Sequence, residues 1–327
     1  MAPFRIFAAS LLFAAAGCRA GALSVDTDLG VATADLGATN DLASGDLSLG
    51  DVPGPGTIGP TGGSVDRLWF AFHGDTRPPE CDQTDQYPSA IIRNIFTREA
   101  AERVQFAVDL GDHMYVCNNS VAEATTQMGF YMEAAALLGR PTFMTMGNHE
   151  CLNGATCTPV SEDANSTVYL KALAPISSLP YYTFNVTTHS GLATFVVIAD
   201  NFWSDTQRQW LEATLTKADS EAKYTIITRH HPPENSQLSN SAIWQIIQAH
   251  KYSLFLAGHS HSYRHDISLD GSGRSLRCGC GGAPISTYPG SFFGYGTVLQ
   301  GPDDRLYVTI FDQATNAIQD AFSVAPQ

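Results

Sequence analysis

Seven short apolar runs, each rich in β-branched or aromatic residues, are spread along the chain between residues 68 and 311. Polar or glycine residues bound each run, which is typical of a buried strand. Helical patterns occupy several of the stretches between them, at about residues 89–102, 121–139, 206–218 and 240–250. Strands that alternate with helices predict an α/β sandwich with mainly buried strands. The runs are Leu68–Phe72, Val104–Leu110, Pro141–Met146, Ala193–Ala199, Tyr224–Thr228, Ser253–Ala257 and Leu306–Phe311.

The beginning of the chain has a different pattern. Residues 1–18 contain one basic residue, Arg5, followed by an apolar stretch of 12 residues from Ile6 to Gly17. This is typical of a secretory signal peptide, and it is shorter than the ~20 apolar residues of a membrane-spanning helix. The alternative is a buried N-terminal helix. The run Ala15-Ala16-Gly17-Cys18 resembles a bacterial lipobox, which predicts membrane attachment through a lipidated Cys18 in the periplasm, at the outer membrane or at the cell surface. Without that lipid, the exported chain would be secreted.

We expect residues 19–64 to form a disordered acidic linker and residues 65–327 to form the folded domain. Asp-Leu pairs recur among small residues in this segment, which therefore cannot bury enough apolar surface to fold. The formal charge of the chain is −14, and six acidic and two basic residues in the first 64 leave −10 for the domain. Such a negative surface disfavours nucleic acid as a bulk partner.

Six cysteines lie in the expected domain, and an even number in an exported chain predicts disulfides. We expect Cys151 to pair with Cys157, because the two enclose a short loop with the turn signal Asn-Gly. The other four are Cys81, Cys117, Cys278 and Cys280. Of these we expect Cys81 to pair with Cys117. The alternative to a disulfide for the Cys-x-Cys at residues 278–280 is a metal chelate.

Residues with potential chemistry follow five of the apolar runs. Ligands of such sheets bind beyond the carboxyl ends of the strands, where the loops gather. We therefore expect these side chains to converge at one site. They are Asp75, Asp112, Asn148, His230 and His259.

Each of these residues belongs to a short cluster, and the clusters resemble the motifs of the calcineurin-like metallophosphoesterases in type and in order, over roughly residues 66–265. Glycine precedes most of the ligand candidates, which would let the backbone turn sharply and approach metal ions closely. The resemblance implies a two-sheet β-sandwich flanked by helices. The clusters are Gly74-Asp75-Thr76-Arg77, Gly111-Asp112-His113-Met114-Tyr115, Gly147-Asn148-His149-Glu150, His230-His231-Pro232-Pro233 and Gly258-His259-Ser260-His261.

The resemblance also implies two metal sites that share Asp112. The first ion would be held by Asp75, Asp112, Tyr115 and His261, and the second by Asp112, Asn148, His230 and His259. The alternative to His230 is His231. A tyrosine at the first site makes this set of ligands similar to that of the purple acid phosphatases. Three anionic ligands there favour Fe(III), whereas the more neutral second set suits a divalent ion such as Zn, Fe or Mn.

The remaining motif residues would act on the substrate. His149 is implied as the group that protonates the leaving group or binds the phosphoryl oxygens, and Asp112 contributes to catalysis as the bridging ligand. Glu150 either orients His149 or caps the loop. Arg77 either clamps a phosphate oxygen or lies on the surface, and His231 is a further substrate-binding candidate. His113 has no motif support, so a surface or helix-end role is expected for it.

These assignments predict a metal-dependent hydrolase, similar to acid phosphatases, that acts on small phosphorylated substrates. A metal-bound hydroxide would attack the phosphate monoester, because such ions lower the pKa of water toward about 7. Purple acid phosphatases have further histidines after the fourth motif, but Glu234 to Ala249 contains none. The alternatives are a phosphodiesterase of the same superfamily and a non-catalytic surface protein that contains metals.

Overall fold

The computed structural model describes residues 56–154, 157, 162–233, 238–268, 270–287 and 291–327. The predicted signal peptide, the lipobox at Cys18 and the linker up to residue 55 lie outside the described residues. The predicted end of the linker at residue 64 was wrong, because β1 (Thr57–Gly59) and β2 (Gly62–Ser64) form within it. Glycine lets this backbone pack closely: a Cβ on Gly62 would lie 1.9 Å from Asn185 O. Within the described part, no helix is both long and apolar enough to cross a membrane.

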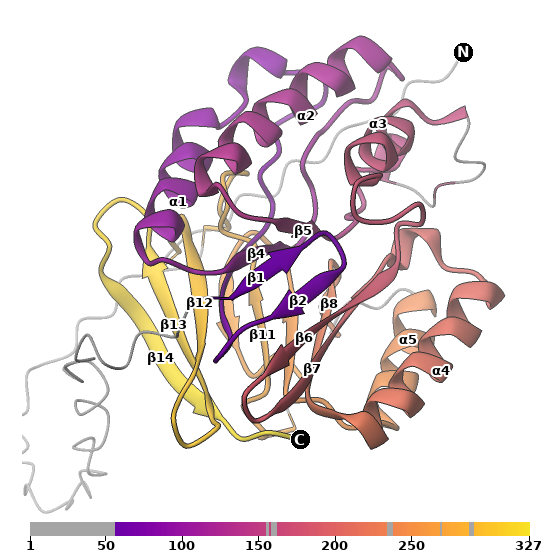
Figure 1. Ribbon diagram of the computed structural model, residues 1–327. Coiled ribbons are helices and arrows are strands. Elements are labelled where there is room, and N and C mark those ends of the chain that lie inside the picture. Colours follow the sequence, from indigo (N-terminus) through magenta and orange to yellow (C-terminus); the bar gives the residue numbers. More distant parts are fainter. Residues whose placement is uncertain (1–55, 155–156, 158–161, 234–237, 269, 288–290) are drawn as a thin grey trace, which may run out of the picture. The chain divides into compact units, whose positions relative to one another are not determined.

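Among the described residues, one sheet has eight strands in the order β1-β2-β6-β7-β8-β9-β11-β10 (Figure 1). Strands β7, β8, β9 and β11 are parallel. Strand β6 pairs antiparallel with β7 and parallel with β2, and β10 pairs antiparallel with β11. The bounds of the new strands are β6 (Tyr182–Thr188), β7 (Gly191–Ile198), β8 (Ala222–Arg229), β9 (Leu254–Ala257), β10 (Tyr263–His265) and β11 (Ser275–Cys278).

A second sheet of the described chain has six strands in the order β14-β13-β12-β3-β4-β5. Strands β3, β4 and β5 are parallel, and β12, β13 and β14 form an antiparallel extension beside β3. Their bounds are β3 (Trp69–His73), β4 (Phe106–Asp109), β5 (Thr142–Met144), β12 (Gly294–Gln300), β13 (Leu306–Asp312) and β14 (Ile318–Val324).

Aromatic side chains fill the space between the two sheets. Phe70 and Phe106 of the six-stranded sheet stack with ring centroids 5.3 Å apart. Both rings meet Phe195 of the other sheet edge-on, at 5.2 and 5.3 Å. The next residue along β7, Val196, belongs to a separate apolar cluster with Leu211 of a covering helix. Side chains of β7 therefore alternate between an inner and an outer core, as the two-residue period of a strand requires.

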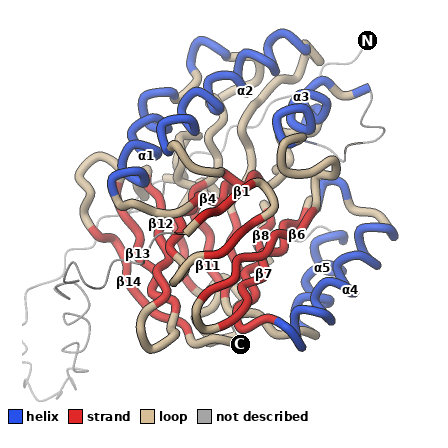
Figure 2. The backbone as a smooth tube through the Cα atoms, in the orientation of Figure 1, coloured by secondary structure: helices blue, strands red, loops and turns tan. Residues whose placement is uncertain are grey.

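Helices cover the outer faces of both sheets (Figure 2). The helices α4 (Asp205–Glu221) and α5 (Leu238–Gln248) pack on the eight-stranded sheet. On the side of the six-stranded sheet, α1 (Ser89–Ala101) contacts α2 (Val121–Ala135), and α2 contacts α3 (Ala164–Leu173). The side chain of Ser120 begins α2 by accepting a hydrogen bond from Glu123 N at 3.3 Å. These layers confirm the predicted two-sheet sandwich flanked by helices.

Candidate metal centre

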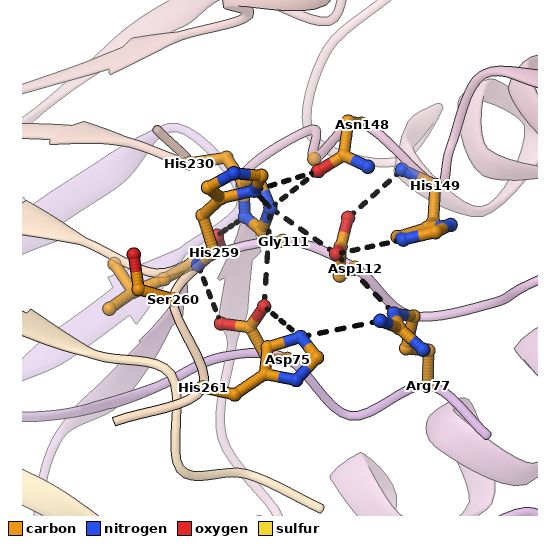
Figure 3. Close-up of polar contacts among 12 residues, drawn as sticks. Asp75, Arg77, Gly111, Asp112, Asn148, His149, His230, His259, Ser260 and His261 are labelled. Atoms are coloured by element: carbon orange, nitrogen blue, oxygen red, sulfur yellow. Dashed lines mark hydrogen bonds and ion pairs between the residues drawn. The ribbon is translucent and has the colours of Figure 1, made fainter. Parts of the chain in front are cut away.

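The predicted ligands follow strands from both sheets. Asp75, Asp112 and Asn148 come after β3, β4 and β5 of the six-stranded sheet. His230 and His259 come after β8 and β9 of the eight-stranded sheet. The side chains point toward one another in Figure 3. The parallel parts of both sheets thus end at a common site, as the sequence predicts.

One group of donors consists of Asp75, Asp112 and His261, whose potential ligand atoms all lie within 4.8 Å of one another. The distance from Asp75 Oδ1 to His261 Nε2 is 3.4 Å. The other ring nitrogen of His261, Nδ1, donates to the carbonyl of Pro284 at 2.8 Å. Because a carbonyl can only accept, the proton of the neutral ring lies on Nδ1, and Nε2 is then the nitrogen that can bind a cation beside Asp75.

A second group of donors surrounds the side-chain oxygen of Asn148. Asn148 Oδ1 lies 3.1 Å from His230 Nε2 and 3.0 Å from His259 Nδ1. His230 Nε2 is also 3.3 Å from Asp112 Oδ2, and its Nδ1 donates to the carbonyl of Leu110 at 2.7 Å. Asp112 therefore contacts both groups, which is the position expected of a shared ligand.

The donors fit a pair of metal ions. Asp75 Oδ1 is buried and makes no hydrogen bond to the described residues. A buried carboxylate oxygen without a hydrogen bond is unfavourable unless a cation lies beside it. Two carboxylates, one amide and three imidazoles form a set that suits iron, zinc or manganese.

Opposite charges in the site maintain its carboxylates in the ionised form. Burial opposes ionisation of Asp112, but His230 and His149 outweigh it and hold the pKa of Asp112 well below its usual range. Burial likewise opposes protonation of His230, yet Asp112 raises the pKa of that imidazole to about 10. His259 behaves differently, because burial and the neighbouring His230 and His231 lower its pKa to about 3.

The glycines beside the ligands mainly leave space for the ligand side chains and backbone, and they contribute less to the sharp turns. A Cβ on Gly147 would lie 2.3 Å from Asp112 Oδ1, and one on Gly258 would lie 2.7 Å from Asp75 Oδ2. The left-handed conformation belongs mostly to the ligands themselves, with φ of 62° at Asp75, 64° at Asp112 and 74° at His259. Backbone in this region is strained for such residues, and it often occurs at functional sites.

Arg77, His149 and Tyr115 form one edge of the centre. Arg77 Nε lies 3.7 Å from Asp112 Oδ2, and the guanidinium stacks 4.6 Å from the Tyr115 ring centroid. The side chain of Arg77 is only 11% exposed, so the alternative of a surface role was wrong. The ring of Tyr115 packs 4.0 Å from that of His149. Ligation through the Tyr115 hydroxyl stays a prediction.

His231 occupies a different position from His230. Its ring lies 4.1 Å from that of His259, and its Nδ1 bonds to Asp200 Oδ2 at 2.7 Å. The same Asp200 oxygen accepts from the buried Arg229 at 2.9 Å. His230 is thus the imidazole placed against Asp112, and the role of His231 in substrate binding stays a prediction. Asp200 lies two residues after the end of β7, as Asp75 does after β3, so the rule that located the other site residues would also have found it.

Of the two roles expected for Glu150, the structure supports the loop cap, because its carboxylate binds backbone amides of the ligand loops. The surface role expected for His113 was wrong, because this residue is fully buried. The segment after β11 was missed as well, although Ala283 N donates to Asp75 O and Ser286 N donates to His261 O, each at 2.8 Å. No sequence motif marks these contacts, because most of them use main-chain atoms.

Two disulfides lie in the segments that follow the site residues. Cys81 pairs with Cys117, and Cys151 pairs with Cys157, as predicted. The first links the segment after Arg77 to the segment after Tyr115. Within the described chain, Cys278 and Cys280 are the buried cysteines without a disulfide.

Comparison with known families identifies the family to which the chain belongs. Residues 49–263 match the model of the calcineurin-like phosphoesterase family. The chain belongs to that family. The segment after β11 that contacts Asp75 and His261 lies beyond the matched residues. Among curated proteins, none matches the sequence significantly.

Solved structures show the same fold at low identity. A purple acid phosphatase, PPD1 from seeds of yellow lupin (Lupinus luteus), aligns over 80% of this chain with a TM-score of 0.57 and 14% identity. This chain covers 54% of the lupin protein, so it spans about half of its length. A dimetal phosphatase from Danio rerio aligns over 80% of this chain and 99% of its own, with a TM-score of 0.55 and 16% identity.

Proposed function

We propose that this protein hydrolyses phosphate monoesters with a pair of metal ions. The observation that carries the proposal is the position of Asp112 between two groups of donors that come from both sheets. Asp75, Asp112 and His261 would hold the first ion. Asp112, Asn148, His230 and His259 would hold the second. When bound, the ions would neutralise charge on the phosphoryl oxygens and lower the pKa of the attacking water.

Tyr115 is the basis of our proposal for the identity of the ions. We propose Fe(III) at the first site, with the Tyr115 phenol as an additional ligand, and Zn, Fe or Mn in the divalent state at the second. The Tyr115 ring lies against His149 and Arg77, beside Asp112. Two carboxylates and a phenolate would bring three negative charges to one ion, which favours a trivalent metal.

His149 and Arg77 would bind the substrate. The backbone amide of His149 donates to Asp112 Oδ1 at 3.0 Å, which fixes the residue beside the shared ligand. Its ring Nε2 lies 3.8 Å from Asp112 Oδ2, and its buried Nδ1 has no hydrogen-bond partner among the described residues. The ring can therefore donate a proton to a leaving oxygen or bind a phosphoryl oxygen. The planar guanidinium of Arg77 suits two oxygens of one phosphoryl group.

Paired aryl substrates test the proposal. We expect turnover of p-nitrophenyl phosphate by the metal-loaded enzyme and much slower turnover of bis-p-nitrophenyl phosphate. Asp112→Ala should abolish both activities while the circular dichroism spectrum is retained. Faster hydrolysis of the diester would favour the phosphodiesterase alternative. Absence of turnover with both metals bound would favour the non-catalytic alternative.

We also propose that the protein is exported, with Cys18 as a lipid anchor. The signal-peptide pattern in residues 1–18 supports this proposal, as do the two disulfides, because such bonds persist in oxidising compartments. Mass spectrometry of the native chain tests it: we expect an N-terminus at Cys18 that carries acyl chains. An intact Met1 would contradict the proposal.

A further inference from the structure

Five fully buried titratable side chains, none of them a candidate metal ligand, contact one another in series beside the metal centre. We call this series the buried polar line. Its members, in order of contact, are Glu99, His73, Asp109, His113 and Glu150. The successive contacts between their side chains measure 2.7, 3.3, 2.7 and 3.1 Å. The line begins on α1, crosses β3 and β4, and ends in the loop after β5.

At its last member, the buried polar line joins two ligand loops. Glu150 Oε2 accepts hydrogen bonds from Gly147 N at 2.6 Å and from Asp112 N at 2.9 Å. Its other oxygen, Oε1, accepts from His113 N at 2.6 Å. Asp112 is the shared ligand candidate, and Gly147 immediately precedes Asn148. A single carboxylate therefore connects the backbone of the loop after β4 to that of the loop after β5.

Asp109, in the middle of the line, also binds the loop after β4 that contains Asp112. Its Oδ1 accepts from Gly111 N at 2.7 Å and also contacts His113 Nε2 at 2.7 Å. Three consecutive amides, those of residues 111 to 113, are thus bound by carboxylates of the line. Asp112 has a φ of 64°, a conformation that persists only where the surroundings hold it.

Stability alone does not explain this arrangement. Burial of charged groups costs free energy, and well-packed apolar residues in their place are often as stable or more stable. The particular effect of the line is geometric, because it fixes the loop of Asp112 relative to the loop of Asn148. A dinuclear centre depends on that spacing, since the second ion needs both residues at once.

We propose that the buried polar line sets the spacing of the two metal sites, with Glu150 and His113 as positioning residues. This inference rests on the proposed dinuclear function. Glu150→Gln replaces one acceptor oxygen by an NH2 group, which would face amide donors and lose their hydrogen bonds. The loops of Asp112 and Asn148 would then separate, and the second site would weaken more than the first.

Manganese binding tests the inference. Mn2+ is titrated into the metal-depleted chain, with affinity measured by chelator competition and metal coupling by electron paramagnetic resonance. We expect wild type with two equivalents to give the spectrum of an exchange-coupled pair. Glu150→Gln should bind the first ion within about threefold of wild type and the second about 10- to 100-fold more weakly. Its spectrum should be that of isolated ions at stoichiometric Mn2+.

Matched controls come from a contact between α4 and the segment after α5. Asp219 accepts from His250 Nδ1 at 2.7 Å and from Lys251 N at 2.8 Å, so it also binds a histidine and a backbone amide, but outside the metal centre. We expect Asp219→Asn and His250→Gln to leave both affinities and the coupled spectrum unchanged. His113→Gln, by contrast, should repeat the effect of Glu150→Gln. If Glu150→Gln fails to fold, His113→Gln alone tests whether the line sets the spacing of the metal sites.

The possible outcomes separate this inference from the proposed function. Coupled spectra and unchanged second-site affinity in both Glu150→Gln and His113→Gln would overturn the inference while leaving the dinuclear centre intact. Unfolding of both variants would also overturn it, because the line would then serve the stability of the whole domain. A wild type that binds fewer than two ions would instead remove the proposed function.

Discussion

The substitution Gly147→Ala tests the geometry of the centre with a single methyl group. The added Cβ would lie 2.3 Å from Asp112 Oδ1, 2.6 Å from Asp112 N and 3.0 Å from Glu150 Oε2. Ordinary contact with a Cβ begins at about 3.4 Å, so Asp112 or the loop must move by about 1 Å. Gly147 is not among the residues with positive φ, so an alanine there meets only this steric conflict.

Two consequences follow from that displacement. Overpacking of this kind typically costs about 1–3 kcal/mol of stability, which urea unfolding would measure. A misplacement of about 1 Å at a reacting centre can cost about 100-fold in rate. We therefore expect kcat for an aryl phosphate to fall about 100-fold, with loss of metal at one site in elemental analysis.

Gly129→Ala on α2 is the matched control. A Cβ at Gly129 would meet nothing within 4 Å. Alanine is favoured over glycine in helices by about 1 kcal/mol, so this variant should be slightly more stable and fully active. A Gly147→Ala enzyme with wild-type kcat and two bound ions would refute the close packing of the loop of Asn148 against Asp112.

Three further predictions concern charge, colour and cross-links. In the metal-free protein the pKa of His230 is raised to about 10, so the charged pair with Asp112 stabilises the fold below pH ~6.5 and is lost as pH rises toward 10. Since a metal needs the neutral ring, Mn2+ affinity measured between pH 6 and 8 should rise at least ~10-fold per pH unit, and a pH-independent affinity would contradict this. Tyr115→Phe should remove the visible absorption band of an iron-loaded enzyme, whereas a colourless all-zinc wild type would exclude the iron assignment. Loss of the 36-residue cross-link in a Cys81→Ala and Cys117→Ala double variant should lower the unfolding free energy by about 4 kcal/mol, and unchanged urea midpoints would contradict a stabilising role.

The strands that carry ligands were predictable because they are predominantly apolar runs. Parallel strands covered on both faces are mostly hydrophobic, so Val104–Leu110 and Tyr224–Thr228 stand out in the sequence. Strands that rely on glycine or on pairing at an edge gave no such signal. β2 has the sequence Gly-Gly-Ser, and it forms through backbone pairing with β6. The order of strands in each sheet likewise depends on contacts distant in sequence.

The ligand candidates were predictable for the same reason, since each follows a recognisable strand. The residues that surround and position these ligands were not predictable. Glu150 acts through the amides of Gly147, Asp112 and His113, and every sequence has amides at those positions. His113 appeared isolated because its partners are 4 residues before it and 37 residues after it. Arg77 was ambiguous because only the fold brings it against Asp112.

Anomalous X-ray diffraction from crystals of the metal-loaded protein would locate the ions. We expect two strong peaks about 3.5–4 Å apart, with Asp112 coordinating both ions. The three remaining donors of the second group, Asn148, His230 and His259, should surround only one of the two peaks. A single peak, or two peaks that do not share Asp112, would contradict the proposed dinuclear centre.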